Sequence, residues 1–178
     1  MGLRIANRPV LDAAGFARAV VVRSEFGEGQ ETVRRGKDEV EPVTYQRFEL
    51  ELQADGTTGP IKMEVFTGTV LNGPIGEKGR GKAKKPTYNR LTGLCLALGL
   101  VQASELDGEI SDDVRGRIEA ALLNLEGDRL KFQLGRVEGR PLPVPVLESF
   151  TRDDTPAPVA SDAEPDTETP EKATPKRK

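Results

Sequence analysis

The residues with the clearest chemical potential lie in a glycine-rich segment near the middle of the chain. Residues 77–90 carry six basic side chains and one acidic side chain, a local charge of +5. The basic residues are Lys78, Arg80, Lys82, Lys84, Lys85 and Arg90. Mobile cations can follow a phosphate backbone, and Tyr88 offers a ring on which a base can stack. This segment is therefore predicted to bind single-stranded nucleic acid, with a solvated loop as the alternative.

The same segment has the glycine and lysine spacing of a P-loop in residues 76–82. A P-loop also needs a hydroxyl for Mg²⁺ after the lysine, and this sequence has Ala83 there. Pro86 disfavours a helical conformation at Lys85, so no helix N-terminus is expected to follow directly. Nucleotide hydrolysis is therefore not expected.

Other catalytic chemistry lacks its usual residues. The chain has no histidine and a single cysteine, Cys95, which is predicted to be a small buried hydrophobe. The densest carboxylates are Asp107, Glu109, Asp112 and Asp113. The last two are interpreted as stabilising a helix N-terminus, and a metal site is the alternative. The chain is not expected to be an enzyme, and no cofactor or metal is expected.

A second group of candidate binding residues lies in the first half of the chain. It consists of Arg34, Arg35, Lys37, Tyr45 and Arg47. Acidic residues flank the first three and could neutralise much of their field. An exposed aromatic ring beside a basic side chain is a stacking surface for bases, which is the role predicted for the last two. Burial beneath a loop is the alternative for Tyr45. Phe66 lies on the parity of Lys62 and Glu64, and for this ring burial is the prediction and an exposed stacking surface is the alternative.

Strands come first among the elements that must position these residues. A β-branched run marks residues 16–24, and apolar and polar residues alternate in residues 44–53 and 61–70, so three strands are predicted. The turn signal at residues 55–59 joins the last two strands into an antiparallel hairpin. Residues 25–41 are rich in glycine and charge and are predicted to form a long flexible loop or a splayed hairpin tip.

Helices are predicted next, within residues 88–126. Thr87 can cap a first helix that ends near Gly99, and Ser111 can cap a second that ends at Gly127. Apolar residues follow helical spacing at Leu91, Leu94, Cys95 and Leu98, and again at Val114, Ile118, Leu122 and Leu125.

Two closing strands complete the predicted domain, at residues 129–135 and 142–147. Three prolines share one parity in and before the last strand, which suits an edge position. Three strands, a helical insertion and two strands is the order of a five-stranded OB-like barrel, in which the face of strands 2 and 3 and the loop after strand 1 belong to the ligand groove. The fold class is therefore mainly β with a helical insertion, and other small barrels or open sheets would give the same order.

The domain is predicted to span residues 1–150, and residues 151–178 are predicted to form a disordered tail. The tail is rich in proline, threonine, alanine and acidic residues, and it ends in a basic tip at residues 176–178. It holds 5 of the 26 basic and 7 of the 29 acidic residues, which leaves 21 − 22 = −1 for the domain. Any affinity for nucleic acid must therefore come from local charge. No segment is apolar enough for a membrane span or a secretory signal, so a cytoplasmic location is expected.

Residues 48–150 resemble the accessory single-stranded DNA-binding proteins of bacteriophages and mobile elements. The resemblance rests on the alternating strands, the connection bearing glycine and lysine, and the segments 88–100 and 125–130. It implies an OB-fold that acts in replication or recombination in a bacterial or phage-infected cell. A tail that recruits partner proteins is a further implication, although the basic end of this tail departs from that pattern. The alternative function is a protein-interaction or structural module, such as a virion or scaffold component, and a homo-oligomer is compatible with either.

Overall fold

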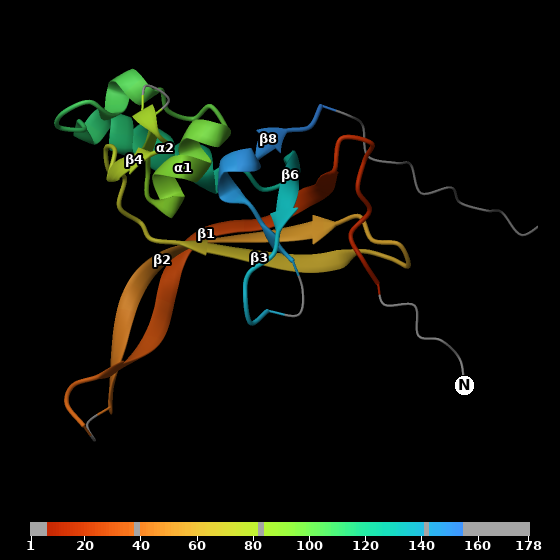
Figure 1. Ribbon diagram of the computed structural model, residues 1–178, viewed down its shortest axis with the longest axis horizontal. Coiled ribbons are helices and arrows are strands. Elements are labelled where there is room, and N and C mark those ends of the chain that lie inside the picture. Colours follow the sequence, from red (N-terminus) through yellow and green to blue (C-terminus); the bar gives the residue numbers. More distant parts are fainter. Residues whose placement is uncertain (1–6, 38–39, 82–83, 141–142, 155–178) are drawn as a thin grey trace, which may run out of the picture.

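The computed structural model describes residues 7–37, 40–81, 84–140 and 143–154. Its main sheet is antiparallel and begins with β1 (Phe16–Arg34), β2 (Val40–Ala54) and β3 (Ile61–Thr67). The other strands are β6 (Arg129–Gly135), β7 (Val144–Pro145) and β8 (Thr151–Arg152). The strand order is β3-β2-β1-β6-β7, and β8 also pairs with β6 (Figure 1). The predicted fold class, mainly β with a helical insertion, is confirmed.

The insertion lies between β3 and β6 and packs over one end of the sheet (Figure 1). It contains a small hairpin of β4 (Gly76–Lys78) and β5 (Lys85–Thr87), followed by α1 (Arg90–Ala97), the 3-10 helix η2 (Ala103–Leu106) and α2 (Asp112–Leu123). Ser111 caps α2 as predicted, because its side chain accepts a hydrogen bond from the amide of Val114. Thr87 was the wrong cap for α1. Asn89 caps it, accepting from the amide of Thr92 at 2.8 Å.

The core lies between the inner face of the sheet and the insertion. Phe48, Leu50 and Leu52 of β2 are fully buried, as their alternation predicted. Phe132 of β6 stacks on Phe150 with ring centroids 4.8 Å apart. Burial of one such side chain stabilises a fold by about 1.5–3 kcal/mol, so this core holds the insertion against the sheet.

Strand β1 is ten residues longer than predicted, because residues 25–34 pair with β2 and do not form a loop. Two glycines there suggested a loop, but they make room for side chains of the neighbouring strand. A Cβ on Gly29 would lie 2.6 Å from the Cζ of Tyr45, so only glycine lets this ring lie across the strand. Beyond the sheet body the two strands continue as a two-stranded β arm, residues 27–34 and 40–47 (Figure 1).

The sheet is open along one side. β3 and β7 lie at the two ends of the strand order, and no pairing joins them in the part of the chain that the structure describes. Both strands line a cavity of about 380 Å³, here called the seam cavity. The last strand is also shorter than predicted, since η3 (Leu147–Ser149) follows β7 directly. The barrel predicted from the sequence is therefore open at this seam.

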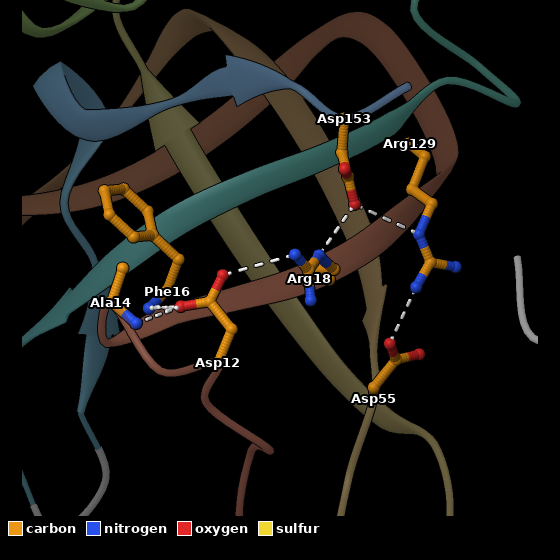
Figure 2. A network of polar contacts seen from close by, with 7 residues as sticks. All are labelled: Asp12, Ala14, Phe16, Arg18, Asp55, Arg129 and Asp153. Carbon is orange, nitrogen blue, oxygen red and sulfur yellow. Dashed lines mark hydrogen bonds and ion pairs between the residues drawn. The ribbon is translucent and has the colours of Figure 1, made fainter. Parts of the chain in front are cut away.

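A network of charged residues fixes the end of the described chain (Figure 2). Asp153 lies 2.9 Å from the Nε of Arg18 and 3.3 Å from the Nε of Arg129, and its side chain is only 5% exposed. Arg129 also contacts Asp55 at 2.9 Å. The predicted boundary at residue 151 therefore falls too early, because residues 151–153 belong to the fold. Residues 155–178, the rest of the predicted tail, lie outside the described part.

Asp12 joins the other side of this network through its contact with Arg18 (Figure 2). Its carboxylate accepts hydrogen bonds from the amide of Phe16 at 2.9 Å and from the amide of Ala14 at 3.0 Å. The pKa of Asp12 is lowered below its ordinary value. The hydrogen bond from the Phe16 amide is the main cause, and the hydrogen bond from the Ala14 amide and the charge of Arg18 act in the same direction. This carboxylate therefore holds the turn that leads into β1.

Candidate nucleic-acid interface

The predicted basic loop is a short β-hairpin. Strands β4 and β5 pair antiparallel, with Lys78 opposite Lys85 and Glu77 opposite Pro86. Glycines at the tip adopt positive φ, 127° at Gly79 and 62° at Gly81. Lys82 lies outside the described residues, as does the Ala83 on which the P-loop interpretation was rejected.

A cavity of about 480 Å³ lies between this hairpin and α1, and we call it the hairpin cleft. The residues around it include Lys78, Lys85, Pro86, Tyr88, Leu96 and Glu148. Three of the predicted binding residues, Lys78, Lys85 and Tyr88, therefore meet at one site. Tyr88 is partly buried against the core, which limits the motion of its ring. The cleft thus combines two mobile cations with a ring of restricted motion and an apolar floor.

Most of the described basic residues at this site form no ion pair within the described part of the chain. Lys78, Arg80, Lys85 and Arg90 form no ion pair with any other described residue, whereas Lys84 contacts Glu77 at 3.2 Å. Arg90 is the first residue of α1, where the helix dipole disfavours a cation by about 0.3–1 kcal/mol. An unpaired cation in that position adds nothing to helix stability. Its charge is available to an anionic ligand.

The outer face of the sheet carries the other predicted aromatic site. The Cζ of Arg47 lies 4.3 Å from the centre of the Phe66 ring, and Tyr45 lies two residues away on the same strand face. We call these three residues the outer-face stack. Tyr45 is 42% exposed and Phe66 is 38% exposed, so the predicted burial of Phe66 was wrong. Phe66 shares the outward parity of Lys62 and Glu64, a signal that could have predicted its exposure.

The basic side chains of the outer face form ion pairs with carboxylates. Arg23 contacts Glu25, Glu49 and Glu51 at 3.0–3.6 Å. The other pairs are Lys62 with Glu51 and Glu64, and Arg47 with Glu49. Hydrogen bonds that Lys62 and Arg47 donate to these glutamates raise the pKa of both basic groups. The outer face therefore offers exposed rings, but its basic groups are already paired.

The third predicted group lies at the tip of the β arm. Arg34 ends β1, Arg35 and Lys37 follow it in the turn, and Arg35 contacts Glu41 at 3.3 Å. In Figure 1 this tip and the β4–β5 hairpin lie at opposite sides of the sheet. The described residues among these predictions thus fall into three separate places. Among the described members of these three groups, Lys78, Lys85 and Tyr88 bring cations without an ion pair and a ring to one cavity, the hairpin cleft.

Comparisons with protein-family models, with curated proteins and with solved structures found no significant match to this chain. The geometry of the sites must therefore carry the functional argument. Within the described residues, no helix has the length and apolar character needed to cross a membrane.

Proposed function

We propose that this chain binds single-stranded nucleic acid, DNA in particular, at the hairpin cleft. One observation carries the proposal: Lys78, Lys85 and Tyr88 surround one cavity whose lysines have no ion-pair partner among the described residues. The lysines contact backbone phosphates, and one base stacks on Tyr88. Arg80, between β4 and β5, and Arg90, the first residue of α1, add positive charge to the same part of the chain.

The proposed role is that of a non-enzymatic accessory protein of replication or recombination, acting in the cytoplasm of a bacterial or phage-infected cell. The unpaired charge supports recognition of the backbone, which carries no sequence information. A single stacking ring supports a short contact of few bases. Single strands are favoured over duplex because a base must leave its stack to reach Tyr88.

A titration of a labelled oligonucleotide, followed by fluorescence anisotropy at several salt concentrations, tests this function. Engagement of about four phosphates predicts a log–log slope of affinity against salt near −3, at roughly 0.7 per contact. Competition with the matching duplex should leave most of the labelled strand bound. Failure to bind any single strand at low salt would refute the proposal.

The β arm favours a second candidate function, a protein-interaction or structural module. It extends beyond the sheet body as only two strands, and such a ribbon is marginally stable alone in water. Val33, Val40 and Val43 on it are between 36% and 54% exposed. In this alternative a partner protein or a second copy covers the arm. A stable oligomer that dissociates on Val43→Asp and ignores nucleic acid would favour it.

A further inference from the structure

The hairpin cleft contains an acidic side chain that contacts to phosphate do not use. Glu148 lines the cleft together with Lys78, Lys85 and Tyr88. It forms no ion pair with any residue that the structure describes, although two lysines border the same cavity. A carboxylate repels the phosphates that these lysines attract. Glu148 therefore suits a contact with a different part of the nucleotide, its base.

The backbone that carries Glu148 is held on both sides. Leu147, before it in η3, is buried in the core, and Phe150, just after η3, is fully buried. The hydroxyl of Ser149 accepts a hydrogen bond from the amide of Gln133 in β6 at 2.8 Å. η3 lies against α1 (Figure 1), so Glu148 faces the cleft from a fixed position.

A glycine of α1 lies directly beside the side chain of Glu148. A Cβ on Gly93 would be 3.6 Å from the Cγ of Glu148, so the aliphatic part of this side chain lies next to the helix backbone. Leu96 and Ala97, three and four residues further along α1, belong to the floor of the cleft. The cleft therefore has cations on its hairpin side and a carboxylate on its α1 side.

We propose that Glu148 recognises a guanine base stacked on Tyr88, an inference that rests on the proposed function. The Watson–Crick edge of guanine presents two adjacent donors, N1–H and the N2 amino group. An ionised carboxylate accepts both at once, because it has two acceptor oxygens and no donor. The cavity volume of about 480 Å³ falls in the range of sites that hold small ligands, roughly 300–1,000 Å³.

The other bases lack this pair of donors. Cytosine and adenine each have one amino group beside a ring nitrogen that accepts hydrogen bonds, and the N3–H of thymine lies between two carbonyls. Each of them would bring an acceptor against a carboxylate oxygen, which lowers affinity. A bidentate contact to a base discriminates by roughly tenfold or more. The cleft should therefore prefer guanine to thymine by about tenfold.

Anisotropy titrations of short thymine strands that differ in one central base test the preference. The strand with a central guanine should bind about tenfold more tightly than the strand of thymine alone, and cytosine or adenine should give little gain. Hypoxanthine keeps N1–H but lacks the N2 amino group. A strand with a central hypoxanthine should therefore lose most of the gain that guanine gives.

A pair of charge-matched variants assigns the preference to Glu148. Glu148→Gln replaces one acceptor by a donor and should remove the preference for guanine. It should bind the thymine strand at least as tightly as the natural chain does, because a charge that repels phosphate is gone. Glu126 is exposed and lies outside the lining of the cleft, so Glu126→Gln should keep the preference.

The outcomes separate this inference from the function on which it rests. Equal affinity for all strands would overturn the guanine preference and leave single-strand binding in place. A preference that survives Glu148→Gln, or a loss of affinity in this variant that is equal for every strand, would also overturn the role of Glu148. Absence of binding to any strand at low salt would refute the proposed function and this inference together.

Discussion

The hairpin cleft and the outer-face stack both combine basic and aromatic side chains, but they differ in what the basic groups contact. In the cleft, Lys78 and Lys85 have no ion-pair partner among the described residues. On the outer face, Arg47 and Lys62 are bound by glutamates. A phosphate would have to displace those carboxylates, whereas it meets free ammonium groups in the cleft. Residue type alone therefore does not define a binding surface, since the neighbours decide whether its charge is available.

The largest expected effect concerns folding, and it lies outside both regions. Asp153→Ala removes the shared partner of Arg18 and Arg129 and should lower the free energy of unfolding by about 3 kcal/mol. Denaturant unfolding measures this loss, and the neighbouring exposed Asp154→Ala is the control. The folded Asp153→Ala protein should bind oligonucleotide with unchanged affinity, and a weaker affinity would mean that the network contributes to binding.

The next effect compares the lysines of the two regions. Replacing Lys78 and Lys85 together by glutamine should weaken single-strand binding by about 100-fold at low salt, since each charge-assisted contact contributes roughly 1.5 kcal/mol. Lys62→Gln on the outer face should change the affinity by less than about twofold. Anisotropy titrations of the two variants provide the comparison. An equal loss in both would erase the distinction between the regions.

The chain's two tyrosines provide a smaller and cleaner comparison. Tyr88→Ala should lower the affinity by about tenfold, because base stacking contributes roughly 1–3 kcal/mol. Tyr88→Phe should retain most of the affinity, since the ring remains. Tyr45→Ala on the outer face should have no effect on binding. If Tyr45→Ala costs more than Tyr88→Ala, the strand crosses the outer face.

The smallest expected effect is on folding stability in acid, and it arises at Asp12, which belongs to neither region. The folded pKa of Asp12 lies below its ordinary value of 3.8, so its contribution to stability is complete above that pH. The contribution is lost as the pH falls through the lower folded value. The midpoint temperature of thermal unfolding should therefore fall less steeply below about pH 4 for Asp12→Asn than for the natural chain. Parallel curves for the two proteins would contradict this role of Asp12.

Much of the sheet and both main helices could be predicted from the sequence, because hydrophobic alternation and capping residues are local signals. The buried parity of β2 and the Ser111 cap are examples. The length of β1 could not be predicted, since Gly29 makes room for Tyr45, sixteen positions away, and local composition suggested a loop.

The sequence indicated residues of the candidate site, but it did not indicate how they are arranged in space. Two lysines of the basic segment, Lys78 and Lys85, line one cleft together with Tyr88, because the β4–β5 pairing brings the two lysines opposite each other beside α1. Arg47 seemed an equally good candidate from its type and parity. Its pairing with Glu49 and its contact with Phe66 depend on how β2 and β3 align, which the sequence does not state locally.

Chemical-shift mapping with a short single-stranded oligonucleotide tests the central claim most directly. Amide resonances should shift in β4, in β5 and around Tyr88 and Arg90, and remain in place on the outer face at Arg47 and Phe66. The account would be contradicted by the reverse pattern, in which Tyr45, Arg47 and Phe66 shift while Lys78, Lys85 and Tyr88 do not.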